Sequence, residues 1–303
     1  MPVPRTFKVQ VLFVLVGVSA WIAIQSLFSE LSVMLKQLPE GPSVASQLVL
    51  AIQCGNLGPM VYSLLRPRLR TGMIFVLFSG LAALVFVALT WNRTVNVAGY
   101  ERSLFLILGT FLSAVADCTS NLVFWPYASS FGAPYVTALA LGESCSSAVT
   151  ALVFFLQKTL IFCSPTSFFM IIAAIVSVCV CAFFLLEFHY GAKMVEKGEE
   201  AVVGGTNVSA AYPDVPDASA REILRAEWKL LLVIVWMSMV QNGFTPSILP
   251  LVAGPAYGTA QNVLFFMAPF SSLLAAWLRP KRSLHLSLFM FTTATLVPKL
   301  LIS

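Results

Sequence analysis

The sequence predicts an all-α polytopic membrane protein, because it is strongly apolar and its apolar residues gather in long runs. Of its 303 residues, 58% are hydrophobic and only 10% are charged. A soluble domain has about a quarter of its residues charged. Long apolar runs separated by short charged segments are typical of helices that cross a bilayer, and they exclude an ordinary soluble fold.

Nine of these runs are long enough to span a membrane. A hydrocarbon core about 30 Å thick requires about 20 residues in a helix that rises 1.5 Å per residue. The runs are residues 9–28, 44–65, 72–91, 103–124, 135–156, 167–188, 230–252, 258–278 and 284–302. The first run follows two basic residues, as a cleaved signal peptide does, but its length favours a membrane span over a short signal core.

The basic residues predict which side of the membrane each loop occupies. Lys and Arg in short loops favour the cytoplasmic side. With a cytoplasmic N-terminus, thirteen of the 18 Lys and Arg residues fall in inner segments, and the other five lie outside: Lys36, Arg93, Arg102, Lys158 and Lys299. The net charge of +5 therefore reflects membrane orientation. No basic, aromatic-interleaved patch predicts a nucleic acid partner.

A hydrophilic segment divides the chain into two parts. Residues 189–228 are rich in Glu, Gly and Pro and poor in aromatic residues, which is typical of a flexible linker. The prediction is a six-helix bundle at 1–188, a cytoplasmic linker at 189–228 and a three-helix bundle at 229–303. A long cytoplasmic loop after the sixth helix is the layout of two-bundle transporters with a site near mid-membrane.

Carboxyl groups within the runs mark candidate binding positions. A charged side chain at the bilayer centre costs about 2.5–3.5 kcal/mol, so it needs a partner or a water-filled cavity. Asp117 lies in the inner half of the fourth run, and Ser113 and Asn121, one turn away on either side, are expected on the same face. Glu143 lies at a compatible depth in the fifth run. Glu30 falls just past the outer end of the first run.

Two other runs combine amides with residues that weaken a helix. These are Gln53, Asn56, Gly58 and Pro59 in the second run, and Gln241, Asn242, Gly243 and Pro246 in the seventh. Such broken stretches line cavities in transporters, where the amides can bind a polar ligand. The alternative stays open, since amides also join neighbouring helices, and Gly and Pro are common in membrane spans.

The sequence predicts neither a metal site nor an enzyme. Five of the six cysteines fall within the runs and only Cys163 faces outside, so no outer disulfide within the chain is expected. His189 and His285 are isolated, and no cysteine pair has zinc-site spacing. No motif of an intramembrane enzyme is present, and no cofactor is predicted. The sequon at Asn92 lies in an outer loop, whereas the one at Asn207 is expected in the cytoplasm.

Several motifs resemble those of the animal riboflavin transporter family, in the family's order over most of residues 15–275. They are the segments 19–25 and 30–31, Leu-Pro-Glu-Gly at 38–41, Gln53, Asn-Leu-Gly-Pro at 56–59, Asp-Cys-Thr-Ser-Asn at 117–121, Pro126, Leu-Gly-Glu at 141–143, Ser146, Asn-Gly at 242–243 and Pro-Ala-Tyr-Gly at 255–258. By these motifs the chain resembles members of that family.

The resemblance implies riboflavin transport across the plasma membrane by a fold similar to the major-facilitator and equilibrative-nucleoside transporters. Carried over position by position, it implies that the following residues face the ligand or gate the pathway: Gln25, Glu30, Asn56, Asp117, Asn121, Glu143 and Asn242. The flat ring of riboflavin suits an apolar, aromatic cleft, and its ribityl hydroxyls and ring imide need amides and carboxylates.

The chain departs from the family pattern at several positions. Pro42 stands where the family commonly has Trp, Gln25 where it has Asn, and Ala268 where it has Asn before a proline. Relative to the family, about two C-terminal helices are expected to be absent. Two alternatives therefore accompany riboflavin transport: a transporter of another flat heteroaromatic such as a nucleoside, and a non-transporting receptor or regulatory paralogue.

Overall fold

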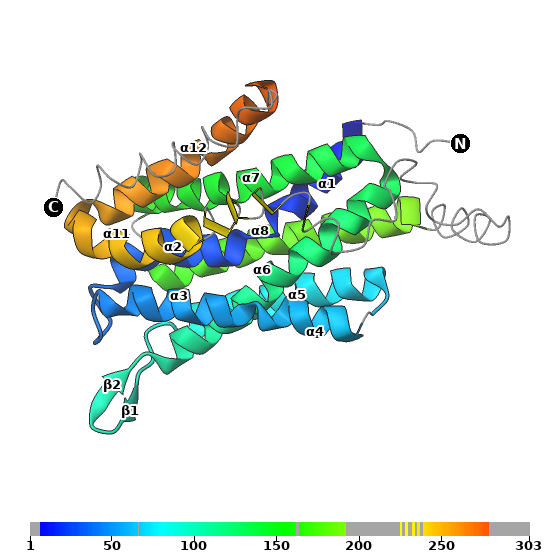
Figure 1. The fold of residues 1–303 in the computed structure, drawn as a ribbon. Helices are drawn as coiled ribbons and strands as arrows, with labels where there is room; N and C mark the ends of the chain where they lie inside the picture. The colour runs from blue at the N-terminus through cyan, green and yellow to red at the C-terminus, as the bar shows by residue number, and fades with distance from the viewer. Residues whose placement is uncertain are drawn as a thin grey trace, which may run out of the picture.

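The structure, a computed structural model, describes residues 7–65, 67–161, 164–191 and 239–278, with residues 225, 228, 229, 232, 233, 235 and 236. The predicted ninth run and most of the predicted linker lie outside these residues, and the seventh run is described only in part. Within them the chain is almost entirely helical, with one short hairpin (Figure 1).

The first predicted run forms two helices, α1 (Phe7–Val18) and α2 (Ile22–Met34), which meet at an angle of 53°. A tight turn separates them. The backbone N–H of Ser19 donates to the carbonyl of Val16, only three residues back, and the Ser19 hydroxyl donates to the same carbonyl. The first run is therefore a bent pair of helices.

The second run is also interrupted where the sequence predicts it. Helix α3 (Ser43–Gly55) ends just before Asn56, and α4 (Leu57–Leu65) follows at once. Pro59 has no N–H to donate back across this junction, which weakens the helical hydrogen bonding there. The predicted weakening of this helix is confirmed.

The seventh run is irregular at its amides as well. Residues Met239–Phe244 form a π-helix, η4, which contains Gln241 and Asn242 and leads into α11 (Thr245–Ala253). A short 3₁₀ turn, η5 (Gly254–Ala256), then connects to α12 (Tyr257–Leu278). Helix α12 covers the predicted eighth run.

The third and fourth runs form α5 (Leu69–Thr90) and α6 (Leu104–Phe131), joined by a hairpin of β1 (Val95–Val97) and β2 (Tyr100–Arg102). Helix α6 continues past the predicted end at residue 124. Its N-terminus is capped from a distant loop, because the backbone N–H and the hydroxyl of Ser103 donate to the two Glu40 carboxylate oxygens at 2.5 and 2.7 Å. Glu40 belongs to the Leu-Pro-Glu-Gly motif.

The fifth and sixth runs form α7 (Ala133–Leu156) and α8 (Pro165–Leu186). Each continues into a π-helical segment, η1 (Gln157–Ile161) after α7 and η2 (Glu187–Gly191) after α8. Segments of this kind turn the following side chains to new directions and are frequent at functional sites.

The chain is a multi-pass membrane protein. Within the described residues, five helices are long and apolar enough to cross a membrane, and the bent α1–α2 pair makes a sixth if it is one span. These six coincide with the first six predicted runs. Helix α12 is not among the five. The count of nine spans stays a prediction.

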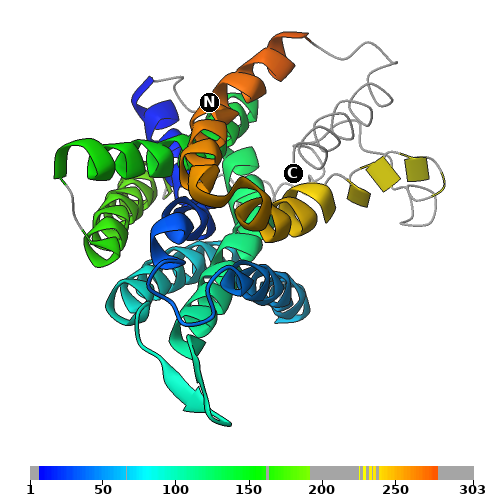
Figure 2. The same cartoon turned by 90° about the vertical axis from the view of Figure 1, so that its left-hand side faces the viewer.

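The helices pack in two groups. Helix α6 contacts α3, α4 and α5, while α7 contacts α1, α2 and α12, and α8 lies against both α1 and α5. In Figure 2, α11 and α12 lie along one side of the bundle, where α11 contacts α3 and α12 contacts α2. The two groups therefore share a continuous core.

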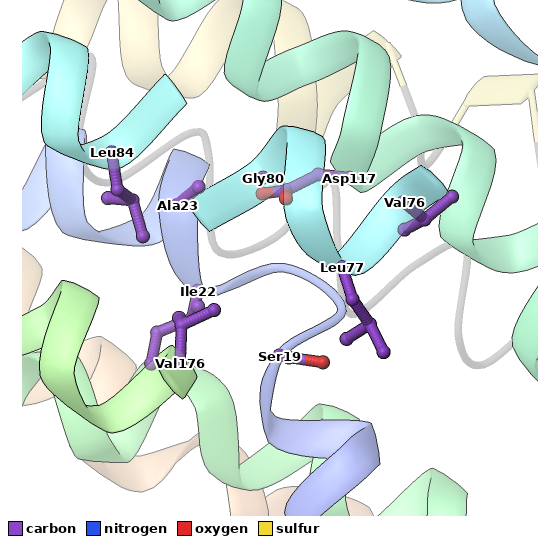
Figure 3. Close-up of a pocket in the computed structure, with 9 residues that line it drawn as sticks. All are labelled: Ser19, Ile22, Ala23, Val76, Leu77, Gly80, Leu84, Asp117 and Val176. Atoms are coloured by element: carbon purple, nitrogen blue, oxygen red, sulfur yellow. The ribbon is translucent and has the colours of Figure 1, made fainter. Parts of the chain in front are cut away.

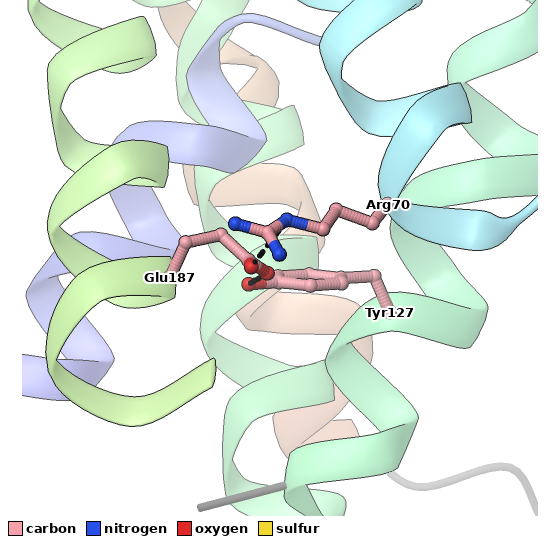
Figure 4. Close-up of polar contacts among 3 residues, drawn as sticks. All are labelled: Arg70, Tyr127 and Glu187. Atoms are coloured by element: carbon pink, nitrogen blue, oxygen red, sulfur yellow. Dashed lines mark hydrogen bonds and ion pairs between the residues drawn. The ribbon is translucent and has the colours of Figure 1, made fainter. Parts of the chain in front are cut away.

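Aromatic rings fill the core where α1, α6 and α7 meet. The ring of Phe13 lies 5.1 Å from that of Phe131 and 5.3 Å from that of Tyr135, centroid to centroid. Beside them, the Tyr127 hydroxyl donates to Glu187 at 2.9 Å, and Arg70 Nε pairs with the other Glu187 oxygen at 2.9 Å (Figure 4). This contact ties α5 and α6 to the end of α8.

Helices α1 and α7 approach closely at two glycines. A Cβ on Gly142 would overlap the Val14 carbonyl oxygen, and a Cβ on Gly17 would overlap the carbonyl oxygen of Leu139. Small residues at such crossings let two membrane helices pack backbone to backbone.

Replacing Gly142 with alanine is therefore expected to destabilise the protein by about 1–3 kcal/mol, the usual cost of overpacking. The measurement is the melting temperature of the detergent-solubilised chain. Gly80→Ala is the matched control, because a Cβ there would meet Ala116 Cβ at an ordinary 3.5 Å. Equal melting temperatures for Gly142→Ala and wild type would contradict the close crossing.

Candidate functional site

Asp117 lies against the break in the first span. Its side chain is only 3% exposed, and it projects from α6 toward the start of α2. The first N–H groups of a helix have no partner within the helix, and the preceding residue, Trp21, makes no side-chain cap. Asp117 Oδ2 accepts the N–H of Ile24 at 2.9 Å, and the carboxyl also accepts that of Ala23. Asp117 thus caps α2 from a neighbouring helix.

A small cavity adjoins this carboxyl (Figure 3). Ser19, Ile22 and Ala23 line it from the break, and the rest of the lining is apolar: Val76, Leu77, Gly80, Leu84 and Val176. Its volume is about 10 Å³, which is room for one water molecule. An organic substrate does not fit beside Asp117 in this conformation.

A polar strip joins α2, α7 and α6. Ser146 Oγ lies 2.9 Å from Gln25 Oε1 and 2.6 Å from the Glu143 carbonyl oxygen. The Trp125 side chain hydrogen-bonds to the Glu143 carboxyl. Asn121 lies exposed one turn before Trp125 in α6. We call these five residues the polar strip.

The polar strip offers an exposed ring face and hydrogen-bonding groups, one of which, Glu143 Oε1, is buried. Trp125 is 37% exposed, and Gln25 and Glu143 are half-buried. Glu143 Oε1 has no hydrogen-bond partner among the described residues. An exposed indole beside amides and a carboxylate suits a ligand that is both flat and polar.

Glu30 lies deeper than its position in the sequence predicts. It falls within α2 and is fully buried, because α2 continues to Met34. Gln157 Nε2, at the start of η1, donates to Glu30 Oε1 at 2.9 Å, while Glu30 Oε2 has no hydrogen-bond partner in the part of the chain that the structure describes.

Helix α12 closes tightly onto α2 next to Glu30. Asn262 is fully buried, and its Nδ2 donates to the Ser29 carbonyl oxygen at 3.1 Å and to the Gly258 carbonyl oxygen at 2.8 Å. A Cβ on Gly258 would overlap the Ser32 side chain. This contact joins the C-terminal helices to the second half of the first span.

The structure describes the side chain of only one of the two remaining predicted residues, Asn56 and Asn242. Asn56 is exposed at the junction of α3 and α4, where its Nδ2 donates to the Gln53 carbonyl oxygen at 3.1 Å. Asn242 belongs to η4, but its side chain lies outside what the structure describes. In the described ranges, no three His, Cys, Asp or Glu side chains gather where a metal ion could bind.

The predicted common face of α6 divides in the structure. Asp117 is buried against α2, whereas Asn121 is exposed. Four residues turn a helix about 40° past a full turn, which is enough to move the second side chain off the buried face. Asp117 and Glu143 also bond to different partners, Ile24 and Trp125. The assignment of the seven residues as ligand-facing stays a prediction.

Three polar contacts involve residues that the sequence analysis did not single out. Trp125 follows Asn121 by four residues and Asn262 follows Gly258 by four, so helical spacing from a recognised motif could have found both. Gln157 carries no such signal, because only the fold brings it to Glu30.

Comparison with known proteins identifies relatives of one kind. A sequence model of the solute carrier family 52 riboflavin transporters matches residues 5–163. Riboflavin transporter 2 of Salmo salar is 29% identical over 242 residues, covering 66% of this chain and 53% of that protein. Riboflavin transporter member 3-B of Danio rerio is 25% identical over 351 residues, covering 94% of this chain and 77% of that protein. Riboflavin transporter member 3 of Homo sapiens is 33% identical over 153 residues, covering 48% of this chain and 33% of that protein.

These relatives are carriers and not enzymes. The chain spans about half the length of the Salmo salar relative. No solved structure matches it.

The cap on α2 can be tested by removing its acceptor. Asp117→Ala would leave two buried N–H groups unpaired, at about 1–3 kcal/mol each, so its melting temperature in detergent is expected to fall sharply. Asp117→Asn keeps a carbonyl acceptor and is expected to fall less. Asn121→Ala, an exposed position on the same helix, serves as the control. A melting temperature of Asp117→Ala equal to that of wild type would rule out the capping role.

Proposed function

Because the chain belongs to the solute carrier family 52 of riboflavin transporters, we propose that it binds riboflavin and carries it across the membrane. The observation that carries this proposal is the polar strip. It combines an exposed indole face with a carboxylate and two amides, drawn from three different helices.

Riboflavin has the two chemical features that the polar strip can recognise. Its flat ring system would stack on Trp125, since aromatic rings pair in offset or edge-on contacts worth about 0.5–1.5 kcal/mol. Glu143 Oε1 is buried without a partner in this conformation, and a movement that exposes it would let it accept a hydrogen bond from a ring imide or a ribityl hydroxyl. Gln25 and Asn121 can each donate and accept, which suits a chain of hydroxyls. Glu30, Asn56, Asp117 and Asn242 would act around this centre as gating or supporting groups.

Transport would proceed by alternating access of two bundles, residues 1–188 and 229–303, joined by a cytoplasmic linker at 189–228. The C-terminal helices pack on α2, α3 and α7, whereas no residue of α4 is buried. With a cytoplasmic N-terminus, α2 and α3 are the outer halves of the first two spans, and α4 is the inner half of the second. This packing supports a conformation closed toward the outside and open toward the cytoplasm.

The membrane arrangement in this proposal is that of a nine-helix protein of the plasma membrane with its N-terminus inside, resembling a two-bundle transporter. The excess of Lys and Arg in the inner segments supports the orientation. The six described spans support the N-terminal bundle.

Riboflavin uptake by cells that express the chain is expected to exceed uptake by vector cells. Trp125→Ala should weaken the apparent affinity about two- to tenfold, because it removes the stacking contact. Trp125→Phe should retain most of it. Leu108→Ala, an exposed leucine on the same helix outside the polar strip, should match wild type.

The same assay separates the alternatives. Uptake no higher than in vector cells would contradict the proposal, and flavin binding without uptake would favour a receptor. If unlabelled uridine competes as well as unlabelled riboflavin, the cargo is a nucleoside-like compound instead.

The outer closure predicts a change in thiol labelling. In a chain whose native cysteines are replaced, Ser29→Cys is expected to react slowly with an impermeant maleimide, because α12 covers it. Adding Gly258→Leu should raise the rate severalfold, since the larger side chain cannot fit against Ser32. Adding Thr259→Leu instead, at the next position, which is exposed, should not raise the labelling rate. Equal rates in all three chains would contradict the closure.

A further inference from the structure

A second cavity lies on another side of the molecule from the polar strip. It is a groove of about 410 Å³ between α4, α5 and α6, helices that Figure 1 labels close together. Its lining is almost wholly apolar, with Leu57, Val61 and Leu65 from α4, Phe75 from α5, and Phe111 and Val115 from α6. We call it the α4–α6 groove.

One end of the α4–α6 groove opens at the turn between α4 and α5. Pro67 and Thr71 line this end, and Arg68 between them is exposed. Arg70 is 65% exposed, but its Nε pairs with Glu187 at the end of α8. The groove therefore ends beside one exposed arginine, Arg68, that can reach an anion.

Polar donors reinforce this end of the groove. Helix α5 begins here, and its first turn has no side-chain cap. The Tyr62 hydroxyl lies 2.8 Å from the position that a Cβ on Gly72 would occupy, so it sits over that first turn. Uncapped backbone N–H groups, a hydroxyl and an exposed arginine together favour a phosphate.

We propose that the α4–α6 groove binds an acyl chain of an anionic phospholipid from the cytoplasmic leaflet, with its phosphate against Arg68. The apolar lining suits the acyl chain, and the arginine complements the negative headgroup. The orientation proposed above puts the α4–α5 turn in the cytoplasm, and the cytoplasmic leaflet carries the anionic lipids. The proposal depends on this orientation but not on the transported cargo.

A lipid in this place would have a structural consequence. No residue of α4 is buried by protein, and α4 contacts mainly α6. An acyl chain between α4 and α5 would supply the missing contacts and hold the inner half of the second span in place. The lipid would therefore stabilise the conformation that is open to the cytoplasm.

The test measures lipid preference on the purified 303-residue chain in nanodiscs made with phosphatidylcholine alone or with added phosphatidylserine. Wild type is expected to retain phosphatidylserine over phosphatidylcholine after detergent extraction, as measured by mass spectrometry. Arg68→Gln should reduce this enrichment about fivefold, the effect of one basic residue near an anionic lipid. Val61→Trp should reduce retention of both lipids, because it fills the groove.

Two matched variants make the result specific. Leu64→Trp adds the same ring to an exposed α4 position outside the groove lining, and Arg93→Gln removes a charge from the hairpin side. Both should retain phosphatidylserine as wild type does. Equal retention of the two lipids by wild type would overturn the preference for an anionic lipid. Unchanged retention by Val61→Trp would overturn the assignment of the lipid to the α4–α6 groove. Lipid retention is measured without riboflavin, so failure here is distinguishable from failure of the transport proposal.

Discussion

The carboxyl group of Asp117 holds the start of α2 in place, and the arrangement of the polar side chains depends on that contact. A break within a membrane span leaves backbone N–H groups without partners, and lipid offers none. Asp117, which lies on α6, accepts hydrogen bonds from two of these N–H groups at the start of α2. Because α2 can then leave α1 at 53°, Gln25 and Glu30 reach α7 and η1. The bend thus aligns two polar contacts along one helix.

The acidic residues divide according to the hydrogen-bonding capacity that the fold leaves them. Both Glu40 carboxylate oxygens accept hydrogen bonds at the start of α6, and the Asp117 carboxyl accepts hydrogen bonds at the start of α2. Glu143 keeps one oxygen unpartnered beside an exposed indole. A group already committed to the backbone cannot exchange partners without cost, whereas a half-buried group with spare capacity can bind a ligand. This difference favours the polar strip as the centre of recognition.

The sequence predicts the helices well and the side-chain partners poorly. Apolar runs and helix-breaking residues locate the first six spans and the junction at Asn56, because both depend on local composition. The partner of Asp117 is a backbone group of another helix, which no side-chain pattern records. Glu30 is predicted at the end of a run but lies inside α2, since polar residues continue the helix past the apolar limit. Trp125 and Asn262 act through tertiary contacts that spacing alone only suggests.

The most direct measurement is an experimental structure of the chain in a lipid nanodisc with riboflavin. The account predicts density for the flavin ring against Trp125, with a ring or ribityl polar atom within hydrogen-bonding distance of Glu143 and α12 closed over Ser29. Riboflavin bound elsewhere, with the polar strip packed against protein or lipid and no space beside it, would contradict the account.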